Sequence, residues 1–236
     1  MSKEEMDIGK ETLRRMGAVD RYNDWVIDRL MPWVGDNVLE VGSGIGNISR
    51  YFLDRKQLIL TDIRDDYLKR LKETFGDRDN ISIYPYDLEG SGKHLVGKGV
   101  DTVIALNVLE HIDNDVGALK EIASILVPGG RIILQIPAHK LLYGTLDTNL
   151  DHFRRYSNSE IKRKFSDCGF KTAACFKINM PGAAGWFVYS RLLKHEILPS
   201  GPLGLFNKLT PLFMALEKTF PVPFGLSIIA VGEKIG

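Results

Sequence analysis

The sequence predicts a single α/β domain, residues 1–236, in which a parallel β-sheet is covered by helices on both faces. A chain of 236 residues usually forms one such domain with insertions. Its composition, 44% hydrophobic and 26% charged, is that of an ordinary globular protein. Short β-branched and apolar runs alternate with amphipathic segments, which is typical of a sheet buried on both sides.

The elements are predicted in chain order. Residues 1–36 form a helical cover, because Val26, Leu30 and Trp33 recur at helical spacing before Gly35 ends the pattern. Strands are predicted at 37–41, 57–61, 81–84, 101–106, 131–136, 170–178 and 226–231. Helices are predicted at 47–54, 65–75, 113–126, 158–168, 186–195 and 211–220. The 158–168 helix has Ser157 or Asn158 as its N-cap and Gly169 as its stop.

The chain divides into a core, 37–137, and a second part, 138–236, which is called the acceptor side because the candidate substrate-binding residues described below lie in it. Residues 37–137 carry the regular alternation and are predicted to bind the cofactor. Residues 138–236 contain a helical insertion, 179–225, before the last strand. This insertion has many large apolar residues, which indicates either a lid packed on the core or an exposed surface for a lipid-like substrate, a membrane or a partner subunit.

Composition and charge exclude several classes of protein. The net charge of +1 provides no overall attraction to nucleic acid, so no nucleic-acid partner is predicted. The two cysteines do not form a Cys-x-x-Cys pair and the histidines are scattered, so neither a disulfide framework nor a metal site is expected. Because the sequence shows no signal peptide and no long apolar run, the chain is predicted to be cytoplasmic. A monomer or homodimer is expected. Peripheral contact with the inner membrane face through 179–225 is left open.

A glycine-rich turn follows the first predicted strand, at Gly42-Ser43-Gly44-Ile45-Gly46. Glycines reach positive φ and leave no Cβ where a ligand approaches the backbone. The dinucleotide fingerprint requires Gly-x-Gly-x-x-Gly, whereas the spacing here is Gly-x-Gly-x-Gly. The turn therefore predicts a nucleotide-like ligand and disfavours NAD(P).

Carboxylates follow the next two predicted strands. Asp62 ends the second strand, where a carboxylate can accept both hydroxyls of a ribose. Asp87 follows the third strand and can accept from an adenine amine. The carboxyl ends of neighbouring parallel strands meet at one crevice, so these residues are predicted to surround one nucleoside, together with Ile63 next to Asp62. The alternative is that both carboxylates only cap helices.

Five motifs in this order resemble those of class I methyltransferases, over residues 20–137. They are Glu40-Val41-Gly42-Ser43-Gly44-Ile45-Gly46, Asp62, Asp87, Asn107-Val108-Leu109-Glu110-His111-Ile112 and Leu126-Val127-Pro128-Gly129-Gly130. The resemblance implies S-adenosylmethionine as cofactor and a Rossmann-like sheet of seven strands with the last antiparallel.

The resemblance also implies roles for single residues. Glu40 orients the methionine amino group, and Gly42, Gly44 and Gly46 form the turn along which the methionine and ribose pass. Asp62 holds the ribose, Asp87 and Leu88 meet the adenine, and the Asn107 backbone faces the methionine end.

The acceptor side offers weaker signals. His111 and His152 are the candidate catalytic bases, since imidazole titrates near neutrality. The segment from His152 to Tyr156 resembles one found in a subgroup of these enzymes linked to glycan or lipid-linked sugar assembly. Tyr143, Arg154, Arg155 and Tyr156 are therefore predicted to bind substrate, unless the arginines pair with protein carboxylates.

Together these features predict methyl transfer from S-adenosylmethionine to a small-molecule or lipid- or sugar-linked acceptor. Two other functions are left open. One is a non-catalytic cofactor-binding module that serves as a partner or membrane-docking protein. The other is an NAD(P)-dependent oxidoreductase.

Overall fold

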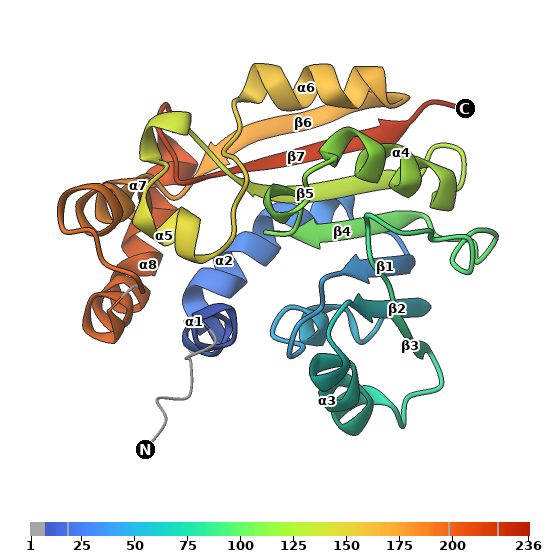
Figure 1. Ribbon diagram of the computed structural model, residues 1–236. Helices are drawn as coiled ribbons and strands as arrows, with labels where there is room; N and C mark the ends of the chain where they lie inside the picture. Colours follow the sequence, from blue (N-terminus) through green and yellow to red (C-terminus); the bar gives the residue numbers. More distant parts are fainter. Residues whose placement is uncertain (1–7, 18, 198, 221) are drawn as a thin grey trace.

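The computed structural model describes residues 8–17, 19–197, 199–220 and 222–236. Sequence predictions that fall on residues 1–7, 18, 198 and 221 lie outside these ranges. One seven-stranded sheet has the order β3-β2-β1-β4-β5-β7-β6 (Figure 1). Its strands are β1 (Asn37–Val41), β2 (Gln57–Asp62), β3 (Ile81–Pro85), β4 (Thr102–Leu106), β5 (Arg131–Pro137), β6 (Phe170–Ile178) and β7 (Ser227–Lys234).

Strand β7 runs antiparallel to both of its neighbours, β5 and β6, whereas β1 to β5 pair in parallel. The predicted fold, including the antiparallel last strand, is confirmed. The central strands are buried along nearly their whole length, as expected for a sheet covered on both faces. In the register, Leu39 of β1 lies beside Ile59 of β2 and Val103 of β4.

Helices cover the sheet in two layers (Figure 1). One core cluster lies under α4 (Asp115–Ile125) and α6 (Asn158–Asp167). The other lies under α2 (Asp20–Leu30), α3 (Asp65–Phe75) and α8 (Ser200–Thr219). The predicted N-cap of α6 is confirmed, because the Ser157 hydroxyl accepts the Glu160 N–H.

Shorter helices connect these layers. They are α1 (Ile8–Gly17), η1 (Met31–Trp33), η2 (Ser49–Phe52), η3 (Leu109–His111), η4 (Lys140–Leu142), α5 (Thr145–Asn149), α7 (Met180–Trp186) and the π-helix η5 (Phe187–Leu192). Helices α5, α7 and α8 gather beyond the end of the sheet towards which β1 and β4 point (Figure 1). None of the helices in the described ranges combines the length and apolarity needed to cross a membrane.

Three helix predictions are corrected by the structure. The segment 47–54 is not an α-helix but the short 3-10 helix η2, whose Ser49 is buried and donates to Glu40 below the glycine turn. The helix predicted at 186–195 begins earlier, at Met180, and becomes the π-helix η5. The helix predicted at 211–220 begins earlier, at Ser200, so that Pro211 lies inside it. Pro202 lies in the first turn, where its missing N–H costs no hydrogen bond.

Candidate active site

The glycine turn lies at the carboxyl end of β1, as predicted. Gly42, Gly44 and Gly46 have φ angles of +71°, +55° and +84°. A Cβ on Gly42 would lie 2.6 Å from Val108 Cγ2, so the backbone of this turn passes close to the loop after β4. The turn therefore needs glycine for both its conformation and its close packing.

Asp62 lies beside this turn, at the end of β2. One carboxylate oxygen accepts the Gly44 N–H at 2.8 Å, and the other accepts the Arg64 N–H at 3.0 Å. Each carboxylate oxygen has two lone pairs, so both can still accept a ribose hydroxyl. The side chain is buried and cannot swing away, which fits a fixed ribose anchor.

Glu40 lies inside β1, below the turn. Its carboxylate accepts the Ser49 hydroxyl, and its backbone oxygen accepts from Thr61. Burial raises the pKa of Glu40 to about 7. A cationic amine near this carboxylate would favour its ionised form, so the position suits the amino group of a bound amino acid.

A cavity of about 240 Å³ opens beyond β2 and β3. It is lined by Ile63, Pro85, Tyr86, Asp87, Gly90, Ser91 and His94. Ile63 is 67% exposed, so its side chain is free to pack on the face of a flat ring. One Asp87 oxygen caps its own loop by accepting the Glu89 N–H, and the other is available to an amine.

Leu88 does not line this cavity. Its side chain is buried in the hydrophobic core under α4. The prediction that Leu88 meets adenine therefore cannot involve its side chain, which is packed in the core. Only its backbone can take part.

Asn107 ends β4 next to the glycine turn. It is exposed, has a φ of 55°, and donates its N–H to Gln135 O at 2.8 Å. Such a φ is uncommon for a residue with a side chain and indicates a turn held by its surroundings. Since β1 pairs with both β2 and β4, the turn, Asp62 and Asn107 lie at adjacent strand ends. This arrangement fits a nucleoside joined to an amino acid.

The two candidate catalytic histidines lie together on the acceptor side. The rings of His111 and His152 cross edge to face, with centroids 4.7 Å apart. Burial, and then the neighbouring His152, lower the pKa of His111 to about 4, so His111 is neutral at physiological pH. His152 Nδ1 lies 3.0 Å from Asp147 Oδ1. An imidazole oriented in this way by a carboxylate presents Nε2 for chemistry.

Asp147 holds this pair in place. Its side chain is fully buried and also accepts from Arg155, Trp186 and the Gly144 N–H. Burial acts to raise its pKa, but the hydrogen bond from His152 and the charge of Arg155 keep the pKa of Asp147 below its usual range. Sequence reasoning missed Asp147, because the segment around it has no periodic pattern.

Glu110 is the second residue that sequence reasoning missed. Its side chain is fully buried, and neither carboxylate oxygen has a hydrogen-bond partner from another described residue. Burial raises the pKa of Glu110 to about 7. The sequence did offer a signal for Glu110, because it directly precedes His111 in the motif Asn107–Ile112.

Two residues predicted to bind substrate support the histidine loop instead. The Tyr143 hydroxyl donates to His152 O at 2.7 Å. The Arg155 side chain is 1% exposed, with Nε 2.7 Å from Asp147 Oδ1 and Nη1 bonded to Ala138 O. The prediction for Arg155 is corrected, because its guanidinium is buried and occupied by protein oxygens.

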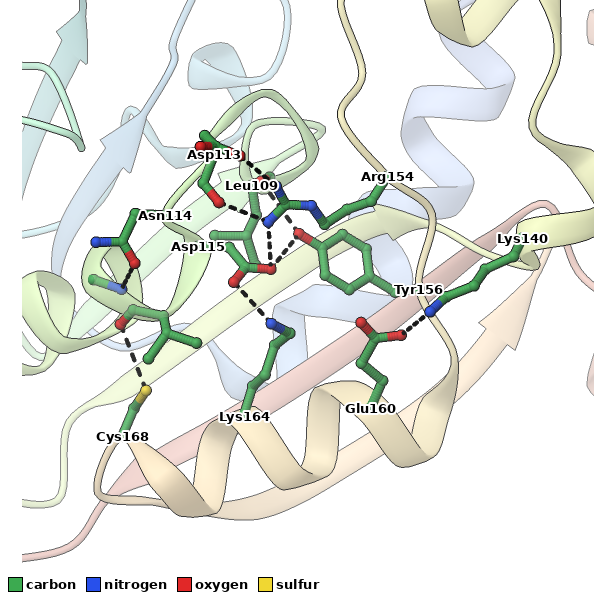
Figure 2. Close-up of polar contacts among 12 residues, drawn as sticks. Leu109, Asp113, Asn114, Asp115, Lys140, Arg154, Tyr156, Glu160, Lys164 and Cys168 are labelled. Carbon is green, nitrogen blue, oxygen red and sulfur yellow. Dashed lines mark hydrogen bonds and ion pairs between the residues drawn. The ribbon is translucent and has the colours of Figure 1, made fainter.

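Arg154 and Tyr156 point into a second network, centred on Asp115 (Figure 2). Asp115 accepts from the Tyr156 hydroxyl at 3.0 Å, from Lys164 at 2.8 Å and from Arg154 at 3.1 Å. Arg154 also pairs with Asp113. The substrate prediction for Tyr156 is likewise corrected, because its hydroxyl is buried in this network. Arg154 keeps a quarter of its side chain exposed while it pairs with Asp113 and Asp115, so its substrate role stays a prediction.

An apolar cavity of about 490 Å³ lies near this loop. It is lined by Leu141, Leu142, Met180, Ala183, Ala184, Phe187 and Phe224. The His139 ring stacks on Phe224 with centroids 3.9 Å apart. All of these lining residues lie within 138–236, the predicted acceptor side.

Comparison with known proteins decides the class. Residues 39–132 match the family described as "Methyltransferase domain". A malonyl-[acyl-carrier protein] O-methyltransferase from Ilyobacter polytropus is 24% identical over 180 residues, which cover 70% of this chain and 67% of that protein. Residues 39–132 therefore belong to a methyltransferase domain, and the chain is an S-adenosylmethionine-dependent methyltransferase.

Further relatives share the domain rather than one acceptor. A tRNA U34 carboxymethyltransferase from Saccharophagus degradans is 25% identical over 177 residues, which cover 67% of this chain and 53% of that protein. Among solved structures, a complex of the Haloferax volcanii Trm112 methyltransferase activator with a methyltransferase matches all of both chains, with a TM-score of 0.66 and 18% identity. A methyltransferase from Mesorhizobium loti covers 92% of the chain and 100% of its own, with a TM-score of 0.62 and 14% identity. Identities this low show the fold alone.

The pH dependence of cofactor binding is expected to follow Glu40. Its pKa in the free methyltransferase is raised to about 7, and the cationic amino group of the cofactor favours the carboxylate. Affinity should therefore rise with pH, by roughly 5- to 10-fold from pH 6 to pH 7.5, a range in which an α-amino group stays largely protonated. Calorimetry with S-adenosylhomocysteine measures this. The Glu40→Gln variant should bind S-adenosylhomocysteine weakly at both pH values. If its affinity still rose with pH as steeply as that of the unchanged chain, another group would be responsible for the titration.

Proposed function

We propose that this methyltransferase transfers the methyl group to a small or lipid-linked acceptor with an extended apolar part. In this proposal the apolar part occupies the 490 Å³ cavity, and the reacting atom lies beside the His111–His152 pair. The observation that carries the proposal is the purely aliphatic and aromatic lining of that cavity. Cavities of this size bind drug-sized molecules, and their apolar lining selects apolar ligands.

Helix α7 links the cavity to the histidines. Ala183 and Ala184 of α7 line the cavity, while Trp186 of the same helix donates to Asp147 at 3.1 Å. Asp147 in turn orients His152. An acceptor bound in the cavity would therefore lie on the same short helix that supports the candidate catalytic group. Methyl transfer is an in-line displacement, so such positioning contributes much of the rate.

An apolar stripe on α8 supports a lipid-linked acceptor. Leu205, Leu209, Leu212 and Leu216 recur at helical spacing and are 60%, 40%, 56% and 47% exposed. The opposite side of α8 packs on the core through Leu203, Phe206, Phe213 and Met214. A helix with one buried and one exposed apolar face suits peripheral contact with a lipid surface. The insertion 179–225 would thus serve both as a lid on the core and as a docking face.

The other functions have less support. The glycine spacing and the methyltransferase-domain match favour S-adenosylmethionine over NAD(P). A non-catalytic module would not need a buried carboxylate that orients a histidine and is bonded to the helix lining an apolar cavity. The sugar-linked acceptor, the absence of a nucleic-acid partner and the monomer or homodimer state stay predictions.

Transfer of radiolabelled methyl groups tests the proposal. The methyltransferase is incubated with labelled S-adenosylmethionine and either lipid extract in vesicles or a polar metabolite extract. We expect label to enter the organic phase from the lipid arm. Ala184→Phe, which fills the cavity from an exposed position, should reduce this transfer by roughly 10-fold or more, the loss expected when a ligand's apolar group is displaced.

Gly185→Ala is the matched control, because a Cβ at Gly185 meets open space on the same helix. Its transfer rate should stay close to that of the unchanged chain. Label entering only polar products would contradict an apolar acceptor. If the protein binds cofactor but labels neither extract, the non-catalytic module would be favoured.

A further inference from the structure

We propose that Glu110, His111 and His152 form a binding site for one divalent transition-metal ion. One carboxylate oxygen and one nitrogen from each ring lie within 4.8 Å of one another. The three residues come from η3 and from the loop after α5, so the fold brings together ligands that the sequence separates. The sequence alone predicts no metal site, because this spacing matches no ligand motif.

The buried carboxylate of Glu110 is the strongest indication. Both of its oxygens are buried and accept no hydrogen bond from another described residue. An unpaired charge in the interior is costly, and proteins usually pair it or use it to bind a metal. The nearby cation Arg155 is already paired with Asp147 at 2.7 Å. Glu110 therefore has no hydrogen-bond or ion-pair partner among the described residues, and its oxygens are free to bind an ion.

His152 is oriented as a metal ligand. A metal-binding histidine typically donates its second ring N–H to a carboxylate, which fixes the ring and its tautomer. His152 Nδ1 makes this contact with Asp147 at 3.0 Å, so Nε2 carries the free lone pair. Asp147 is itself held by Arg155, Trp186 and Gly144, which makes this support rigid.

His111 completes the set and provides access. It follows Glu110 in η3, and its ring lies 4.7 Å from that of His152. Its side chain is only half-buried, whereas Glu110 and His152 are buried, so an ion can reach the cluster past His111. The general-base role predicted for His152 does not explain Glu110, while an ion held by all three residues does.

The ligand set favours a particular class of ion. Two imidazoles and one carboxylate suit zinc, iron or manganese, whereas magnesium and calcium prefer oxygen ligands alone. In a tetrahedral site, ligand atoms about 2.1 Å from one ion lie roughly 3.4 Å apart, so the widest pair must close by up to about 1.4 Å. A rotation of the unbonded Glu110 side chain can provide this.

Such an ion would have a coordination position free for an acceptor oxygen. Three protein ligands leave at least one position open, and a bound hydroxyl loses its proton more readily. This step rests on the proposed function and points to acceptors that react through a hydroxyl group. The ion, and not His152, would then favour ionisation of that hydroxyl, because the Nε2 lone pair is used for binding. The hydroxyl proton would pass to solvent water beside the half-buried His111, and the resulting oxygen would take the methyl group as the sulfonium becomes S-adenosylhomocysteine.

Metal binding is tested without any acceptor. The full chain is treated with chelator, dialysed, and titrated with Co²⁺ followed by absorbance, and with Zn²⁺ by calorimetry. We expect one equivalent to bind. Glu110→Gln and His152→Asn should each weaken binding by at least roughly 100-fold, more than a supporting residue would. His195→Asn, which changes an exposed histidine on the insertion, should leave the affinity within twofold.

Variants that still bind S-adenosylhomocysteine are folded and can be interpreted directly. If they do not fold, X-ray absorption on the zinc-loaded unchanged chain decides, with two imidazoles and a carboxylate oxygen expected around the ion. Absence of one-to-one binding would overturn the proposal. So would Zn²⁺ binding that His195→Asn abolishes and Glu110→Gln does not affect. Since no methyl transfer is measured, failure here leaves the proposed function standing.

Discussion

Replacing Asp62 by alanine is expected to weaken cofactor binding by roughly 10²–10⁴-fold. The loss corresponds to two charge-assisted hydrogen bonds to the ribose, each worth about 1.5–3 kcal/mol. The structure adds a second contribution, because the same carboxylate accepts the backbone N–H groups of Gly44 and Arg64. Without this carboxylate, the glycine turn loses a hydrogen bond that fixes its backbone, and the ribose loses its acceptor. Calorimetry or fluorescence titration with S-adenosylhomocysteine measures the change.

Two variants separate these contributions. Asp62→Asn keeps one acceptor oxygen and the side-chain size, so its loss should be smaller than that of the alanine variant. Asp65→Ala removes an exposed carboxylate in the first turn of α3 and should leave affinity within twofold. Affinity that stays within twofold in Asp62→Ala would show that the ribose lies elsewhere.

Replacing Asp115 by alanine is expected to lower the free energy of unfolding by about 3–5 kcal/mol, the cost of breaking a buried ion pair. Asp115 is 3% exposed and accepts from Tyr156, Lys164 and Arg154 (Figure 2). The variant leaves a buried hydroxyl and two cations without their shared acceptor. For a domain of this size the melting temperature should fall by roughly 6–20 °C, measured by calorimetry or circular dichroism.

Asp113→Ala is the matched control for this prediction. Asp113 also pairs with Arg154, but its side chain is 74% exposed, so the pair is worth at most about 1 kcal/mol. The two variants remove the same chemical group two residues apart, and they differ in burial and in the number of partners that lose it. Equal losses from both would mean that the network in Figure 2 does not anchor the loop to α4 and α6.

The acceptor-side predictions fared differently from those for the core. Ser157 was correctly predicted as a cap because a cap is a local contact, three residues long. Arg155 and Tyr156 were predicted to face substrate, yet both are buried and bonded to Asp147 and Asp115. A sequence shows that an arginine is present but not which carboxylate lies within reach. That depends on how the loop after α5 folds back towards α4.

The sequence by itself determined the features that depend on contacts between residues close together in the chain. Burial on both faces produces continuous apolar strands, and a tight turn needs glycine at positive φ, so the sheet and the turn after β1 were both visible in advance. Only the tertiary structure decided how His111, His152 and the unpaired Glu110 come together, and that Asp147 holds them. The physical reason is that a contact between residues some forty positions apart, such as that between His111 and His152, depends on strand order and loop path, which no local pattern records.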